Sequence, residues 1–506
     1  MTIHHPTPAG KKDRPWIKAI RQVLFAMLIG IALAAALPYV IGEELTVRGV
    51  ARIYAPLVGV DRGTEGRDAV SVLLIDDKSL QNAQQTWPAS YGYYARLLDS
   101  LALYRPRAVF IDVVFASRRD DASIERLVNA TCRARAAGTL VYLAVRRSET
   151  GSFPLRAELQ DVVPRCIEPV AIEYDPDTLD QIAWNYRIQP ELTQDGASLH
   201  SVAATIYRDL GGALPTQGHA ALAINWGYRP ANSGIEWLVA DQREHAGQAT
   251  EAAHGDTAGQ AANPVNATSD GATFSPYCRQ PGNPLYETLP PALRNHWNPD
   301  AFKPVCVFHE TLYPADLSTS SEDEERRLTA LLRDRVMMIG TALQGSNDRV
   351  TSPLHGSVPG VYLHAAALDN LLHYGDHYKR TVHLGGHGDG LRVLVLLIFG
   401  FAVMVAMNAG ARRLRQRFLL KPAAKVSAFK RRLIVARNGS ARRSIRFVAY
   451  TAFFTVMVFV GQRLDLGMLT VAHVSLFASL AEWLEWGEKL EVWWTGEPSH
   501  DHALQA

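Results

Sequence analysis

The chain has few cysteines, almost no net charge, and none of the short motifs that mark common catalytic families. Four cysteines occur among 506 residues with no Cys-x-x-Cys pair, which argues against a zinc-binding module. A GxSxG motif, a kinase glycine-rich loop and an HRD-type catalytic loop are also missing. A formal charge of +2 excludes a protein that is basic throughout, as many nucleic-acid-binding proteins are.

The charges that are present are separated along the chain. Residues 1–21 contain five basic and one acidic side chain, and residues 412–446 contain thirteen basic and no acidic ones. The long segment between them is acidic overall. Because short segments on the cytoplasmic side of a membrane retain Lys and Arg, this distribution is typical of a protein with several membrane crossings.

Uncharged apolar stretches border these basic segments. A helix needs about 20 apolar residues to cross a bilayer, and the stretches within 22–42 and 392–411 reach that length. Two shorter stretches predict a helical hairpin over 447–481, which either spans the bilayer or is re-entrant or buried. The sequence therefore predicts one N-terminal and about three C-terminal transmembrane helices, although 22–42 also has the features of an export signal.

One topology satisfies every segment. Residues 1–21, the basic loop 412–446 and the tail 482–506 are expected in the cytoplasm, and residues 43–391 on the opposite side. We predict a multi-pass protein of the bacterial inner (cytoplasmic) membrane with its large domain in the periplasm.

All four cysteines lie in the segment that this topology exports. An even number of cysteines in an oxidising compartment predicts two disulfides. Proximity in the sequence favours Cys132 with Cys166 and Cys278 with Cys306, although four cysteines allow three pairings. The alternative is that they are free, buried thiols.

The exported segment alternates between short apolar runs and amphipathic stretches. Strands are expected over 70–77, 107–115, 139–145 and 335–340. Helices are expected over 91–103, 121–137 and 361–373. Strands that alternate with helices predict an α/β fold with a mainly parallel sheet. Residues 241–275, rich in Ala, Gly, Gln, Asn and Thr, are expected to form a low-complexity insertion within this domain.

The order of these segments resembles the type-2 CHASE domain (cyclase/histidine-kinase-associated sensory extracellular). The motifs that carry the resemblance are LLIDDKSL at 73–80, FIDVVF at 110–115, VMMIGTA at 336–342 and PGVYLHAAALDNLL at 359–372. The resemblance covers about 45–380 and implies an extracytoplasmic sensor with one membrane helix before it and three after it. Family members typically continue into an output domain. Only a short tail follows residue 481 here, so the resemblance implies signalling through a partner protein in trans.

Several aspartates follow predicted strands, at the sheet edge where open α/β domains bind ligands. Together with one aromatic residue and one glycine, they are the candidates for binding a small molecule or an ion: Asp76, Asp77, Trp87, Asp112, Asp120, Asp121, Gly340 and Asp348. Carboxylate oxygens suit Mg²⁺ or Ca²⁺, but whether a metal binds is left open. The alternative roles are helix capping, loop hydrogen bonding and packing.

The basic loop has a topological role and a further candidate role. Basic residues close to a membrane attract anionic lipid headgroups. The candidates for lipid contact are Arg412, Arg413, Lys430, Arg431, Arg432, Arg442 and Arg443. The loop contains only two aromatic residues, Phe418 and Phe429, which argues against nucleic-acid binding.

These observations favour a membrane-anchored receptor without a catalytic output domain of its own. No cofactor and no enzymatic activity are predicted, and a homo-oligomer is compatible with the sequence. Two alternatives remain. The chain could be a structural or accessory subunit of an envelope complex, or a metal-dependent hydrolase that uses the aspartates.

Overall fold

The computed structural model describes residues 43–188, 191–192, 198–214, 221–231, 278–289, 294, 296, 302–318, 321–345, 348–382, 390–418 and 428–483. The chain divides into two compact units, residues 52–381 and the segments that flank them. The stretch 22–42 and the insertion predicted over 241–275 lie outside the described residues.

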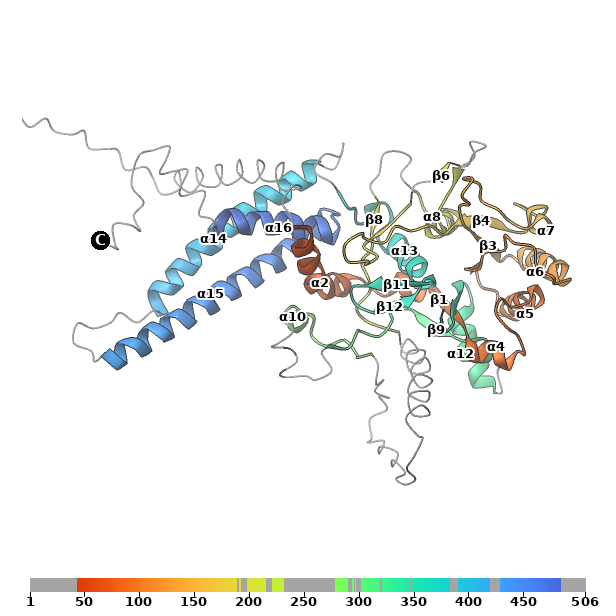
Figure 1. Ribbon diagram of the computed structural model, residues 1–506, viewed down its shortest axis with the longest axis horizontal. Helices are drawn as coiled ribbons and strands as arrows, with labels where there is room; N and C mark the ends of the chain where they lie inside the picture. Colours follow the sequence, from red (N-terminus) through yellow and green to blue (C-terminus); the bar gives the residue numbers. More distant parts are fainter. Residues whose placement is uncertain are drawn as a thin grey trace, which may run out of the picture. The chain divides into compact units, whose positions relative to one another are not determined.

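A parallel sheet of six strands forms the centre of unit 52–381 (Figure 1). The strand order is β4-β3-β2-β10-β1-β9, and every neighbouring pair is parallel. The strands are β1 (Val70–Asp76), β2 (Ala108–Ile111), β3 (Leu140–Val145), β4 (Glu168–Ala171), β9 (Glu310–Leu312) and β10 (Val336–Ala342). The parallel α/β fold predicted from the sequence is therefore confirmed, and β4 and β9 are strands that the sequence did not predict.

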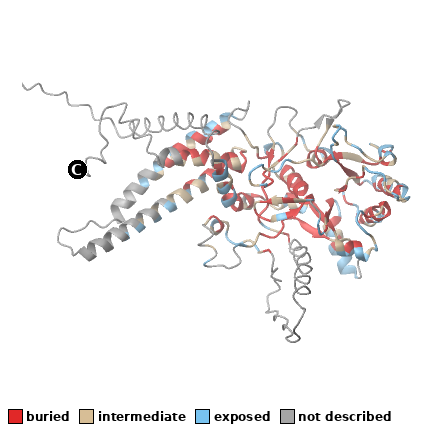
Figure 2. Ribbon diagram, in the orientation of Figure 1, coloured by how far each residue is buried: buried red, intermediate tan, exposed pale blue. Residues whose placement is uncertain are grey.

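Each central strand contributes side chains to two hydrophobic cores, one on each face of the sheet. In β1, Val72 and Leu74 enter one core, whereas Leu73 and Ile75 enter the other. All four side chains are completely buried, as are most residues of the sheet (Figure 2). A strand buried on both faces reads as a continuous apolar run, which is why the sequence indicated these strands clearly.

Helices cover both faces of the sheet. The first core includes residues of α8 (Val202–Asp209) and α13 (Val361–Tyr374). The second includes residues of α5 (Tyr91–Ala102), α6 (Ile124–Ala136), α7 (Ala157–Gln160) and α12 (Glu322–Leu332). The predicted helices over 91–103, 121–137 and 361–373 correspond to α5, α6 and α13.

Local side chains define where these helices begin. The Ser90 hydroxyl accepts a hydrogen bond from the backbone N–H of Tyr93 at the start of α5. Ser321 does the same for Glu324 at the start of α12, whose first turn is acidic as the helix dipole favours.

Shorter elements connect and flank the sheet. The antiparallel pairs are β5 (Asn185–Tyr186) with β8 (Leu222–Ala223), β6 (Glu191–Leu192) with β7 (Ser198–Leu199), and β11 (Arg349–Ser352) with β12 (Gly356–Pro359). The remaining helices are α2 (Glu43–Asp61), α3 (Glu65–Asp68), α4 (Asp77–Asn82), α10 (Pro284–Glu287), η3 (Pro314–Leu317) and η4 (Gly375–His377).

Two disulfides cross-link unit 52–381. Cys132 is bonded to Cys166, and Cys278 is bonded to Cys306. The pairing that sequence proximity favoured is confirmed. The second disulfide joins residues on either side of α10, and both of its cysteines belong to the first hydrophobic core.

Three helices pack together in the C-terminal part of the chain: α14 (Gly390–Phe418), α15 (Ala428–Arg463) and α16 (Met468–Trp483). Arg392 on α14 pairs with Asp465 in the turn between α15 and α16, with 3.1 Å between Nη1 and Oδ2. These helices contain the predicted apolar stretches. Over its described residues, however, none of the helices combines the length and apolar character that a bilayer crossing requires. The crossings predicted for 392–411 and 447–481 are therefore not confirmed.

Close packing of β10 against α13 generates a prediction. A Cβ atom on Gly340 would lie 2.5 Å from Cβ of Val361, in the first turn of α13. Since neither element can move without disturbing the core, we expect Gly340→Ala to lower the free energy of unfolding by about 1–3 kcal/mol. Chemical denaturation of the full chain measures this change.

Gly49→Ala is the matched control, because a Cβ atom there has no neighbour within 4 Å. Gly49 lies inside a helix, where Ala is favoured over Gly by about 0.5–1 kcal/mol. If Gly340→Ala were as stable as the parent protein, the contact between β10 and α13 would not be as close as described.

Candidate functional site

The carboxyl ends of three neighbouring strands form the candidate site. After β1 the chain forms β2 and leaves one strand position between them, and this gap is filled later, when the chain returns to form β10. Ligands of open α/β sheets bind at the carboxyl ends of the strands, at the point where the strand order reverses. Asp76 ends β1, Asp112 follows β2, and Asp348 lies in the segment between β10 and β11.

The structure brings two of the candidate aspartates together at this edge. Asp112, partly buried, extends the β2–β10 pairing because its backbone N–H donates to the Ile339 carbonyl at 2.8 Å. Burial and the neighbouring Asp348 carboxylate hold the pKa of Asp112 well above its ordinary value. Asp348 is exposed at the surface, but its partial burial still raises its pKa. We call Asp112 and Asp348 the carboxylate pair.

Two tyrosines and a histidine accompany the carboxylate pair. Burial, and then the charge of Asp348, raise the pKa of Tyr174. Burial raises the pKa of Tyr186 as well, and the charge of Asp112 adds to this shift. The Tyr186 hydroxyl lies 2.8 Å from Nδ1 of His364 on α13. Burial lowers the pKa of His364 to about 3, so this imidazole is neutral and accepts the tyrosine proton through Nδ1 or donates its own. Two neighbouring carboxyl groups with raised pKa values favour a bound proton or a cationic ligand.

Other predicted candidates have structural roles. The Asp76 carboxylate caps α4 by accepting from the backbone N–H of Ser79 at 2.7 Å. Oδ2 of Asp77 accepts from the backbone N–H of Gln344 at 2.8 Å, which ties the loop after β10 to α4. Asp121 accepts from the backbone N–H groups of Tyr91 and Ser123 at 2.6 and 2.8 Å. Burial acts to raise the pKa of Asp121, but these hydrogen bonds lower it below its ordinary value.

The last three candidates do not join the carboxylate pair in any described contact. Asp120 is exposed, and Trp87 keeps 46 % of its surface exposed. The space that a side chain on Gly340 would need is filled by Val361, so this glycine serves packing. Across the described residues, no three His, Cys, Asp or Glu side chains are grouped so that they could hold a metal ion.

The sequence reasoning missed a buried ion pair at the opposite end of α13. Arg62 and Asp369 have no exposed side-chain surface, and the guanidinium Nη2 contacts Oδ2 of Asp369. Nε2 of His309 lies 3.0 Å from the same oxygen. Burial lowers the pKa of Arg62 to about 10, so it remains cationic at neutral pH. Burial and the nearby charges of Arg62, His355 and Arg67 lower the pKa of His309, so it is neutral and donates to Asp369.

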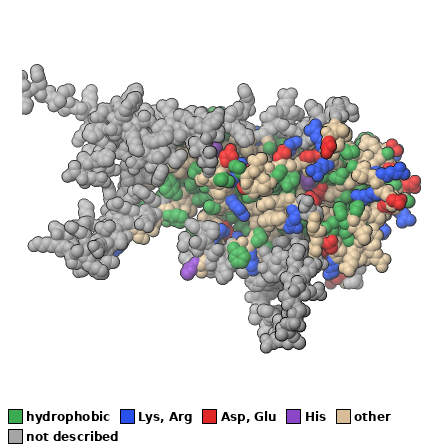
Figure 3. All heavy atoms as spheres, in the orientation of Figure 1, with side chains coloured by type: hydrophobic (Ala, Val, Ile, Leu, Met, Phe, Trp, Pro, Cys, Tyr) green, Lys and Arg blue, Asp and Glu red, His purple; other side chains and the backbone are tan. Residues whose placement is uncertain are grey.

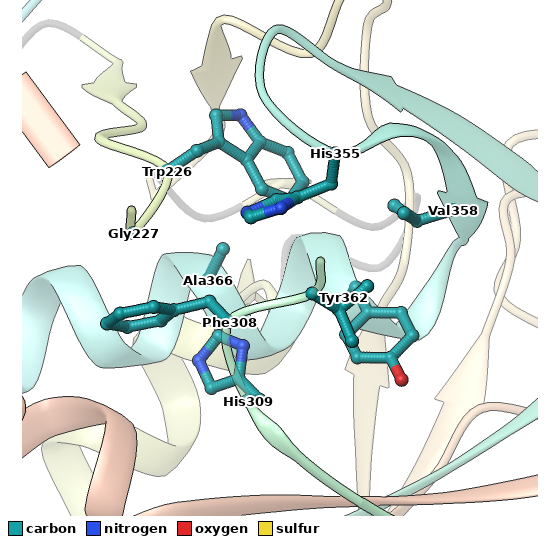
Figure 4. Close-up of a pocket in the computed structure, with 9 residues that line it drawn as sticks. Trp226, Gly227, Phe308, His309, His355, Val358, Tyr362 and Ala366 are labelled. Atoms are coloured by element: carbon teal, nitrogen blue, oxygen red, sulfur yellow. The ribbon is translucent and has the colours of Figure 1, made fainter. Parts of the chain in front are cut away.

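A small cavity adjoins this ion pair (Figure 4). Trp226 and His355 lie on one side of it, and Phe308 and His309 on the other. The centre of a water molecule can occupy about 10 Å³ there, which is room for about one water. The cavity is therefore too small for a metabolite.

The surface of unit 52–381 carries charges of both signs. On the face that Figure 3 shows, Lys and Arg side chains are interspersed with Asp and Glu. The candidates for lipid contact lie in α14 and α15, but their side-chain surroundings are outside the described part of the chain.

The carboxylate pair generates a prediction about pH. The raised pKa of Asp112 means that the folded state favours the protonated form. The stability that this group contributes is thus complete below the ordinary carboxyl pKa and is lost as the pH rises through the folded value. We expect Asp112→Asn to raise the free energy of unfolding at pH 7.5 by about 1 kcal/mol, the scale of an interaction between partly exposed charges.

The difference between variant and parent should disappear as the pH approaches 4, in denaturation curves recorded between pH 4 and 8. Asp120→Asn, at an exposed aspartate, is the control and should follow the parent at every pH. An effect of Asp112→Asn that does not depend on pH would contradict a raised pKa of Asp112 in the folded state.

Comparison with known proteins identifies the family. Residues 50–405 match the CHASE2 domain, which is more than half of the chain. No curated protein and no solved structure matches the chain significantly. The resemblance inferred from the sequence motifs is confirmed: the chain belongs to the CHASE2 family of extracytoplasmic sensory domains.

Proposed function

We propose that this protein is a membrane-anchored receptor in which a cationic cue or a proton acts on the carboxylate pair. The observation that carries the proposal is the placement of two like-charged carboxyl groups at the carboxyl edge of the sheet, beside the central strand. Both groups have a raised pKa, so their repulsion is relieved when a positive charge binds. Membership of a sensory family supports a role in signalling.

The receptor is proposed to act on a partner protein rather than to catalyse a reaction. The candidate aspartates are dispersed into capping and loop contacts, which weakens the hydrolase alternative. A sensor that changes conformation on binding needs a different affinity for the cue in its two states. The carboxylate pair provides such a difference, because any movement that separates the two groups lowers their affinity for a shared cation.

We place unit 52–381 in the periplasm, anchored by the apolar stretch 22–42. Two disulfides support an oxidising compartment. The basic residues of 412–446 are proposed to lie at the inner surface, against anionic lipid headgroups.

Cation binding tests the proposed function. We expect Ca²⁺, Mg²⁺ or spermidine to raise the melting temperature of the purified full chain, because a bound cation relieves the repulsion within the pair. At 100 times its dissociation constant, a ligand stabilises the folded state by about 2.7 kcal/mol. The stabilisation should be lost in Asp112→Asn/Asp348→Asn and kept in the exposed control Asp120→Asn.

If a cation raised the melting temperature of the double variant and the parent equally, it would bind at a site other than the carboxylate pair. If none of the three probes changed the melting temperature, a cation would be ruled out as the cue. The pH dependence of stability would then be the evidence that the cue is a proton.

Accessibility labelling tests the topology. After mild reduction of intact cells with a permeable outer membrane, we expect a membrane-impermeant maleimide to label Cys132, which is partly exposed. A cysteine introduced at Arg431 should be labelled only after the inner membrane is opened. Labelling of both positions from the same side would refute the proposed topology.

A further inference from the structure

The second half of helix α13 carries two adjacent polar side chains that are completely enclosed. Every residue from Val361 to Leu371 is buried, including Asp369 and Asn370, which have no exposed surface. A buried polar side chain is costly unless it is bonded, so its partners specify which segments must lie against the helix. Asp369 contacts Arg62, and Asn370 hydrogen-bonds to the backbone of Asn225. Both Arg62 and Asn225 belong to segments that adjoin the C-terminal end of α2.

Asp369 holds the residue that follows α2. Arg62 comes directly after the last residue of the helix, and its guanidinium contacts the Asp369 carboxylate and the Asn225 carbonyl. The guanidinium also lies 4.9 Å from the ring centroid of Phe308, a cation–π distance. We call Arg62, Asp369 and His309 the Arg62 network.

Asn370 makes a second connection to α2. Its side chain accepts from the backbone N–H of Asn225 at 3.1 Å and donates to the Asn225 carbonyl at 3.2 Å. Three residues later, the backbone N–H of Tyr228 donates to the carbonyl of Gly59 in the last turn of α2 at 3.2 Å. A Cβ atom on Gly59 would lie 2.5 Å from the Trp226 carbonyl oxygen, so this contact leaves no free space.

The opposite end of α13 touches the carboxylate pair. The backbone N–H of Gly360, which precedes the helix, donates to the Asp348 carbonyl at 3.1 Å. A Cβ atom on Gly360 would lie 2.3 Å from Oδ1 of Asp348, so the carboxylate packs directly against the start of the helix. One turn further, His364 bonds Tyr186 beside Asp112.

From this placement we infer that α13 transmits the state of the carboxylate pair to the Arg62 network, which sets how the end of α2 is held. The inference rests on the proposed function, because it takes the carboxylate pair as the place where the cue acts. From Gly360 to Asp369 the helix rises about 14 Å, at 1.5 Å per residue. A closely packed helix moves as a rigid body, so a displacement at its first turn reaches Asp369 undiminished.

The Arg62 network is suited to switch between two arrangements rather than to deform gradually. Removing one partner of a buried ion pair is far more costly than replacing both partners with apolar residues. Arg62 therefore stays paired with Asp369 or moves to another position in which its charge is paired. Intermediate positions would leave a buried charge without its counterion.

Hydrogen exchange of the full chain, followed by mass spectrometry, tests the inference. Asp112→Asn removes one charge of the carboxylate pair and imitates its cation-bound state. We expect this substitution to change the exchange rates of amides in residues 52–61 by about fivefold or more, the range of typical allosteric coupling. Amides of α5, on the other face of the sheet, serve as the internal control: they report any change in global stability, and the change in residues 52–61 is measured relative to them.

The second step removes the Arg62 network while keeping its volume. In Arg62→Met/Asp369→Leu, the effect of Asp112→Asn on residues 52–61 should fall below about twofold. The effect near Asp112 itself should persist. Should this double variant fail to fold, Arg62→Gln/Asp369→Asn removes both charges, keeps polar side chains of similar size, and is expected to give the same results.

Three outcomes would overturn the inference. Residues 52–61 could respond equally with and without the Arg62 network, or α5 could respond as strongly as α2. In the third, Asp112→Asn changes exchange near the carboxylate pair but not in residues 52–61. If Asp112→Asn alters neither exchange nor the free energy of unfolding anywhere, the proposed function itself is refuted.

Discussion

The return of the chain to insert β10 between β1 and β2 is the constraint on which the domain depends. β1 and β2 have no direct pairing, because β10 is hydrogen-bonded to both. The sheet is therefore incomplete until residues from the second half of the chain arrive. Gly340 makes this arrangement possible, since Val361 occupies the place of its side chain and brings α13 against the middle of the sheet. The carboxylate pair and the Arg62 network are both consequences of where α13 then lies.

The two polar sites at the ends of α13 differ in electrostatic character. The carboxylate pair holds two groups of like charge, partly accessible, whose repulsion a cue can relieve. The Arg62 network holds opposite charges that are fully enclosed and paired with each other. A single buried helix, α13, lies between the two sites and contacts a residue of each.

Sequence patterns predicted the parts of the fold that depend on local order. The apolar run at 70–77 is typical of a strand buried on both faces, and Tyr94, Leu97 and Leu98 have the spacing of one helix face. The short strands β4 and β9 were missed because four and three residues carry no periodicity. The charged residue Asp369 within the apolar run of α13 was a usable sign of a buried partner, but nothing in the sequence indicated Arg62, about 300 positions earlier.

By itself the sequence determined the family and the parallel α/β class, because these follow from motif order and apolar runs. It favoured the disulfide pairing, which the folded chain then decided. Only the tertiary structure decided which aspartates act together. Asp112 and Asp348 are far apart in the chain and meet because β2 and β10 are neighbours in the sheet. Asp76 and Asp121 look equivalent to them in sequence, yet they cap helices. The charge environment of a carboxylate depends on neighbours that only the folded chain assembles.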